Sequence, residues 1–168
     1  GENSCHGAFI LNPVCIFIFV GGCVCEAVYC RLWRVSPYRT LVSGAVKTAG
    51  AMAAVFAVDP APAPGFLAAL FLALFFWEIG GQNIPNDMTD IEEDRQMMAR
   101  TIPVCFGVER SIAIAVASLS AAVLINPVVF QLAALPRKGF FSLLALAVGC
   151  CLLLWPALRL VQGKGRDP

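Results

Sequence analysis

The sequence predicts an all-α, polytopic transmembrane helix bundle of about five membrane-spanning helices, in a single domain over residues 1–168. Of the 168 residues, 59% are hydrophobic and only 14% are charged, and the mean hydropathy is +0.78. Soluble domains average about half apolar and a quarter charged residues, so this composition is typical of an integral membrane protein. The net charge is +1 and the basic residues are scattered, so no nucleic acid partner is expected. The eight cysteines lie mostly in apolar runs, which argues against a disulfide-rich secreted scaffold.

Five apolar runs approach the roughly 20 residues that a helix needs to cross a bilayer core. They cover residues 8–30, 40–58, 60–77, 111–136 and 139–158. Two of them carry one ionisable residue inside the run, Glu26 in the first and Lys47 in the second. Such a residue is costly in a span and usually faces the bundle interior, so Lys47 is a candidate for a polar site. A lysine whose ammonium group reaches the membrane surface explains Lys47 equally well, and an interfacial position is the simpler interpretation of Glu26.

The distribution of Lys and Arg predicts the orientation of these spans. Residues 31–39, the segment 81–110 and the C-terminal tail together hold nine basic residues, whereas the connections on the opposite side hold two. We therefore expect the acidic segment 81–110 and the tail on the cytoplasmic side, with the N-terminus outside.

Polar chemistry concentrates within this segment, where Asp87, Asp90 and Asp94 follow the spacing i, i+3, i+7. On a helix, these carboxylates would share one face and repel each other unless a cation lay among them. Mg²⁺ suits such a place because it takes oxygen ligands from one or two carboxylates and the rest from water or phosphate. Arg95 and Arg100 follow closely and are able to bind phosphate oxygens.

Other interpretations of this segment are less specific. The spacing does not match a calcium EF-hand loop, and a zinc site is disfavoured because the single histidine, His6, lies at the far terminus. An acidic stretch between two membrane helices is also most often a solvated loop, and the charge count alone favours that explanation.

A longer pattern makes the segment more specific. Residues 86–107, NDMTDIEEDRQMMARTIPVCFG, resemble the second aspartate-rich motif of the UbiA superfamily of intramembrane prenyltransferases, which has the pattern N-D-x-x-D-x-x-x-D-R, T-[IL]-P-V and a glycine. The matching residues are Asp87, Asp90, Asp94, Arg95, Arg100, Thr101, Pro103 and Gly107. Tyr29 and Arg34 resemble a second family element, Y-x-x-L-[KR]-R, in which Trp33 stands here at a usually basic position.

The resemblance implies Mg²⁺-dependent transfer of a prenyl group from an isoprenyl diphosphate to a hydrophobic acceptor within the lipid bilayer. It leaves the acceptor open among quinone precursors, other aromatic compounds, lipids and tetrapyrroles. By resemblance, Asp87, Asp90 and Asp94 are metal ligands, and Asp90 and Asp94 are also the catalytic residues. The implied substrate-binding residues are Asn83, Asn86, Arg95, Arg100, Lys47, Tyr29 and Arg34.

The sequence also departs from the family pattern. Family members have about nine membrane helices and a first motif, N-x-x-x-D-x-x-x-D, which does not occur in these 168 residues. The resemblance therefore implies a partial UbiA-like fold, a fragment that we expect to be weakly active or inactive by itself. A rival hypothesis is a non-catalytic membrane protein whose acidic loop binds cations or a partner subunit. Arg95, Arg100 and the T-I-P-V string favour the prenyltransferase, because a cation path does not need them.

Overall fold

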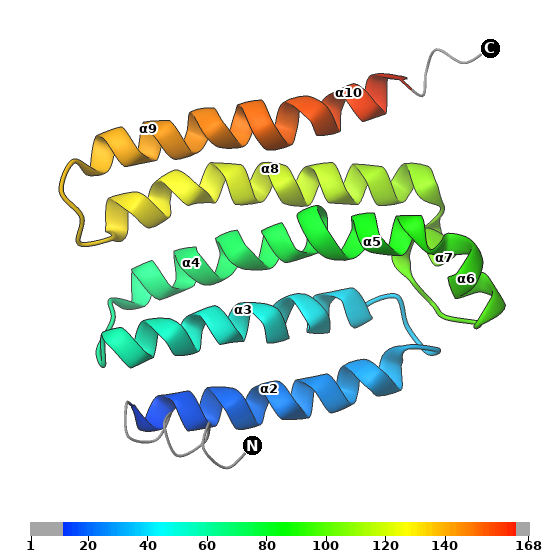
Figure 1. Cartoon of the computed structure of the whole chain (residues 1–168), viewed down its shortest axis with the longest axis horizontal. Coiled ribbons are helices and arrows are strands. Elements are labelled where there is room, and N and C mark those ends of the chain that lie inside the picture. Colours follow the sequence, from blue (N-terminus) through cyan, green and yellow to red (C-terminus); the bar gives the residue numbers. More distant parts are fainter. Residues whose placement is uncertain (1–11, 164–168) are drawn as a thin grey trace.

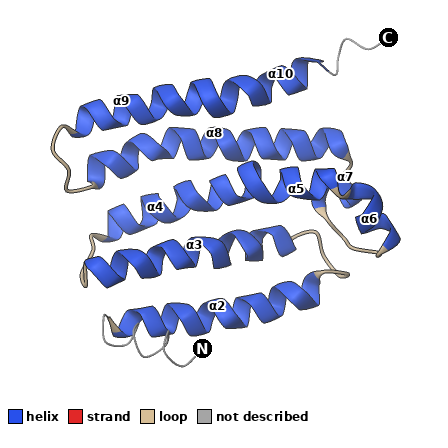
Figure 2. Cartoon of the chain, viewed as in Figure 1, coloured by secondary structure: helices blue, strands red, loops and turns tan. Residues whose placement is uncertain are grey.

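The protein forms one row of long helices. The computed structural model describes residues 12–163, and within this range all regular secondary structure is helical, without a strand (Figure 2). Five helices are long and apolar enough to cross a membrane, which confirms the predicted fold class. The beginning of the first predicted span, residues 8–11, lies outside the described residues.

Three of the spans are single helices, namely α2 (Pro13–Leu32), α3 (Arg39–Val58) and α8 (Val108–Leu132). The other two contain π-helical turns. The third span joins α4 (Pro64–Trp77), the π-helix η1 (Glu78–Asn83) and α5 (Ile84–Thr89). The last joins α9 (Lys138–Gly149), the π-helix η2 (Cys150–Leu154) and α10 (Trp155–Gly163). Two short helices, α6 (Ile91–Gln96) and α7 (Ile102–Phe106), lie between α5 and α8.

The spans run up and down in sequence order, so that each packs against its neighbours along the chain (Figure 1). The connection from α2 to α3 and the short helices α6 and α7 share one end of the row. The connections from α3 to α4 and from α8 to α9 share the other end. This arrangement brings residues near position 30 close to the acidic segment, although about 60 residues separate them in the sequence.

The start of α2 illustrates how side chains fix the ends of the spans. Asn12 caps the helix by accepting a 2.9 Å hydrogen bond from the Val14 N–H, and Pro13 occupies the first helical position, where it has no hydrogen bond to lose. The Asn12 amide also donates to the Phe56 carbonyl at 3.0 Å, which ties the start of α2 to the end of α3.

The densest packing joins the third span to α8. Ile79 and Ile84 are buried together with Ala115, and a Cβ on Gly80 would lie only 2.5 Å from the Ala115 carbonyl oxygen. Glycine is therefore the residue that lets these two backbones meet. By contrast, α2 exposes most of its apolar side chains, as expected of a helix that faces lipid.

The segment 81–110 differs from the loop that the sequence suggests. The third span continues as a helix to Thr89, and residues 91–96 and 102–106 are also helical. The expected single helix face for the three aspartates is wrong, because α5 ends before Asp90 and α6 begins after it. The Thr89 hydroxyl lies 2.7 Å from the Asn86 carbonyl and 2.9 Å from Asp90 Oδ1, contacts that compete with continuation of the helix.

Candidate functional site

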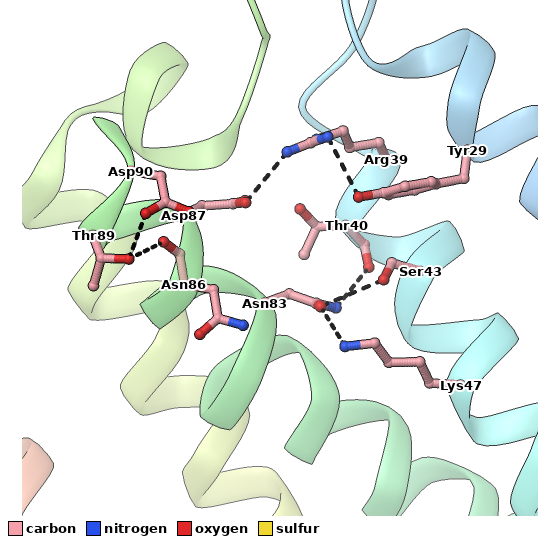
Figure 3. Close-up of polar contacts among 10 residues, drawn as sticks. All are labelled: Tyr29, Arg39, Thr40, Ser43, Lys47, Asn83, Asn86, Asp87, Thr89 and Asp90. Atoms are coloured by element: carbon pink, nitrogen blue, oxygen red, sulfur yellow. Dashed lines mark hydrogen bonds and ion pairs between the residues drawn. The ribbon is translucent and has the colours of Figure 1, made fainter. Parts of the chain in front are cut away.

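A buried arginine joins three helices at the end of the row that carries α6 and α7. Arg39, the first residue of α3, places its Nη2 3.3 Å from Asp87 Oδ1 on α5, and its Nη1 donates to the Tyr29 hydroxyl on α2 at 3.4 Å (Figure 3). Its guanidinium also lies 5.4 Å from the centre of the Tyr29 ring, within cation–π range. The Arg39 and Asp87 side chains are only 10% and 16% exposed, so water screens this ion pair weakly.

The polar contacts continue deeper along α3 and η1. The side-chain amide oxygen of Asn83, Oδ1, accepts from Lys47 Nζ at 3.1 Å and from the Ser43 hydroxyl at 3.4 Å (Figure 3). Lys47 Nζ also lies 3.1 Å from Glu78 Oε2. The structure thus turns Lys47 toward the polar cluster, as one of the two sequence interpretations suggests.

These side chains enclose very little space. Tyr29, Arg39, Thr40, Ser43, Asn83 and Asp87 line a cavity of about 20 Å³. That volume is enough for about one water molecule. A larger polar ligand must therefore bind at the mouth of this cluster or separate its side chains.

The remaining acidic residues lie beside Asp87 at the junction of α5 and α6. Asp90 is exposed, whereas Asp94 is half-buried and its Oδ2 is shielded from water with no hydrogen-bond partner. The negative charges of Asp90 and Asp94 are close enough to Asp87 to repel its carboxylate. A buried carboxylate oxygen without a donor is costly, and a bound cation or donor would remove that cost.

Three of the basic residues that the sequence suggests lie on the surface. Arg95 pairs with Glu92 at 2.9 Å, and both side chains are exposed. Arg34 is exposed and stacks on Trp33, with its guanidinium 5.7 Å from the ring centre. Arg100 is also exposed, and its backbone N–H donates to the Trp33 carbonyl at 3.0 Å. This last bond fastens the α2–α3 connection to the acidic segment.

The structure therefore divides the sequence-based candidates into two groups. It brings Tyr29, Lys47, Asn83 and Asp87 into one connected cluster, with Asp94 nearby. It leaves Asn86, Asp90, Arg34, Arg95 and Arg100 exposed around that cluster.

The sequence alone does not identify Arg39 and Ser43 as site residues. Arg39 was counted only as a loop charge because it directly precedes the second apolar run. The detectable signal is its spacing, since Arg39, Ser43 and Lys47 stand at i, i+4 and i+8 on one face of α3. Glu78 ends the third apolar run, where an interfacial position is its simpler sequence interpretation and a place in the polar site is the other; in the structure it pairs with Lys47.

The arrangement fits a metal ion only if other ligands complete its coordination. Within residues 12–163, no three Asp, Glu, His or Cys side chains lie close enough together to hold a metal ion by themselves. The unpartnered Asp94 Oδ2 and the neighbouring carboxylate of Asp87 are nevertheless hard oxygen donors. They fit Mg²⁺, which binds one or two carboxylates and completes its shell with water and phosphate oxygens.

Comparison with known families identifies the chain. The sequence model of the UbiA prenyltransferase family matches residues 4–168. The chain belongs to the UbiA prenyltransferase family. Comparison with curated proteins gives no match, and comparison with solved structures gives none either. Membership in the UbiA family, together with five apolar spans, makes the chain an integral multi-pass membrane protein of the prenyltransferase class.

Proposed function

We propose that this UbiA family chain binds an isoprenyl diphosphate and Mg²⁺ at the end of α2, α3 and α5, for transfer of the prenyl group to a hydrophobic acceptor. The observation that carries the proposal is the buried contact between Arg39 and Asp87, beside the unpartnered Asp94 oxygen. Fixed positive charge and metal-binding carboxylates at the end of apolar helices suit a ligand with an anionic head and a hydrocarbon chain.

The positive groups would hold the diphosphate. Arg39 and Lys47 are held in place by their contacts with Asp87 and Asn83. Arg95 and Arg100 are long, exposed side chains at the mouth of the cluster and would close over the phosphates from outside. Tyr29, Arg34, Asn83 and Asn86 complete the proposed substrate-binding set.

Asp87, Asp90 and Asp94 are the proposed Mg²⁺ ligands, and Asp90 and Asp94 act at the reacting end of the diphosphate. When bound, Mg²⁺ neutralises the negative charge that develops on the departing diphosphate. The apolar helices exclude water, which would otherwise react with an allylic cation. The excess of Lys and Arg at this end favours a cytoplasmic position for the site.

The non-catalytic alternative, a loop that binds cations, receives less support. Such a loop needs only carboxylates, whereas Arg39 and Lys47 bring two positive charges into this cluster. A buried arginine beside Asp87 would also oppose binding of a free cation, whereas it favours binding of a phosphate.

Binding of tritiated geranyl diphosphate to the purified chain in nanodiscs tests the proposal. We expect Mg²⁺-dependent binding, and we expect Asp90→Asn to abolish it. Glu93→Gln is the matched control, because Glu93 is an exposed carboxylate at a variable position of the motif. Unchanged binding in Asp90→Asn would count against the proposed function.

A further inference from the structure

An open groove between α2 and α3 has no role in the site described above. Its volume is about 310 Å³, at the lower end of the range for small-molecule sites. Its walls are apolar or small residues, among them Gly22 on α2 and Val46 and Gly50 on α3. Among the described residues that line the groove, Glu26 is the only charged one.

The groove continues the same helix faces that build the polar cluster. On α2, Gly22, Glu26 and Tyr29 stand at i, i+4 and i+7, and on α3, Arg39, Val46 and Gly50 stand at i, i+7 and i+11. Glu26 therefore lies about 4.5 Å along the helix axis from Tyr29, one turn deeper in the span.

The two helices close together again at the far end of the groove. There the Cys15 thiol lies 3.4 Å from the Ala53 carbonyl oxygen. From Glu26, the groove lining extends along α2 to Ile18, a rise of about 12 Å. The groove thus starts beside the proposed diphosphate site and ends inside the apolar part of the row.

Glu26 lies within the candidate span α2, and the structure leaves its carboxylate exposed along the open side of the groove. Among the described side chains, none forms an ion pair with it, and it lies about 9 Å from the end of α2 at Leu32. An ionisable group at such a position is costly and commonly marks a substrate pathway. A ligand that donates a hydrogen bond would reduce this cost.

We infer that the groove binds the acceptor substrate, a hydrophobic compound whose hydroxyl group donates a hydrogen bond to Glu26. The naming of this ligand as the acceptor rests on the proposed function. The negative charge of the Glu26 carboxylate repels a diphosphate. The polar group of the ligand at Glu26 is therefore a hydrogen-bond donor and not a second anion. The position of Glu26, one turn from Tyr29, brings this acceptor beside the diphosphate held near Arg39.

Photolabelling of the chain in nanodiscs with 4-hydroxybenzophenone tests the inference without requiring prenyl transfer. The control probe is 4-methoxybenzophenone, which has the same apolar body but no hydroxyl donor. We expect the hydroxyl probe to label groove residues at least about tenfold more than the ether, the factor that a hydrogen bond to a charged group provides. We expect Glu26→Met, which keeps a similar side-chain length, to remove this preference.

Two glycine variants control for the position of the probe. A Cβ on Gly50 or on Gly21 would meet no atom within 4 Å, so neither position opposes the first atom of a side chain. Gly50 lines the groove and Gly21 does not. Gly50→Leu should therefore reduce labelling about tenfold, as expected for a filled pocket, and Gly21→Leu should leave it unchanged.

Equal labelling by the two probes, or a preference that survives Glu26→Met, would overturn the inference and indicate ordinary lipid partitioning. The outcome is separable from the proposed function. Hydroxyl-selective labelling without Mg²⁺-dependent binding of geranyl diphosphate would retain the groove as a binding site for a hydroxyl compound and reject the proposed function.

Discussion

Replacement of Arg39 by methionine tests the central contact of the site. The two charged atoms are 3.3 Å apart and their side chains are 10% and 16% exposed, so methionine would leave the Asp87 carboxylate poorly solvated and without its cation. At an effective dielectric constant near 20, the attraction between two unit charges at this distance is about 5 kcal/mol. Loss of one partner from a buried pair costs about 3–5 kcal/mol, and water near the helix ends favours the lower value.

For a domain of this size, a loss of about 3 kcal/mol corresponds to a decrease of about 6–12 °C in melting temperature. Melting of detergent-solubilised protein, followed by the monodisperse peak in size-exclusion chromatography, measures this decrease. The double variant Arg39→Met/Asp87→Asn should recover most of it, because no charge is then left unpaired. Arg34→Met is the matched control, since Arg34 is exposed and stacks only on Trp33. The reasoning is refuted if Arg39→Met melts like Arg34→Met, or if Asp87→Asn brings no recovery.

Two further predictions concern the π-helical turn that precedes Asp87. Gly80→Ala should lower the free energy of unfolding by about 1–3 kcal/mol, because the new Cβ would lie 2.5 Å from the Ala115 carbonyl oxygen of α8. Gly21→Ala is the control and should leave the stability unchanged, because its Cβ meets no atom within 4 Å. Equal melting temperatures for the two variants would exclude the close approach of Gly80 to α8. Deletion of Gly81 should convert the π-helical turn to an α-helical one in which Glu78 and Asn83 stand four residues apart, so both side chains should still face Lys47. Lys47→Met should then destabilise the deletion variant and the parent chain equally to within about 0.5 kcal/mol, and loss of the Lys47 effect in the deletion variant would contradict the prediction.

The sequence was sufficient for the five spans because length and hydropathy determine which segments cross a membrane. The sequence was not sufficient to predict the direction in which each polar side chain points. The aspartate spacing predicted one continuous helix, but the Thr89 hydroxyl contacts the Asn86 carbonyl and Asp90, and the helix breaks there. The sequence does not predict that Arg39 is buried, because this burial depends on contacts with Tyr29 and Asp87, which are distant in the sequence. Such contacts follow from the order of helices in the row, which composition does not specify.

The π-helix η1 explains how one span serves both the packing core and the polar cluster. In an α-helix, Glu78 and Asn83 would point about 140° apart, because each residue turns the chain by about 100°. In a π-helix, residues five apart lie nearly above one another, so both side chains reach Lys47. The opposite side of the same turn still presents Ile79 and Gly80 to α8. The close packing on α8 thus fixes the rotation of the turn, and that rotation sets the direction in which Asn83 faces α3. A one-residue deletion in this turn would place Glu78 and Asn83 four residues apart on an α-helix, still on one face, so the turn holds one more residue than an α-helix without changing the side that these two side chains face.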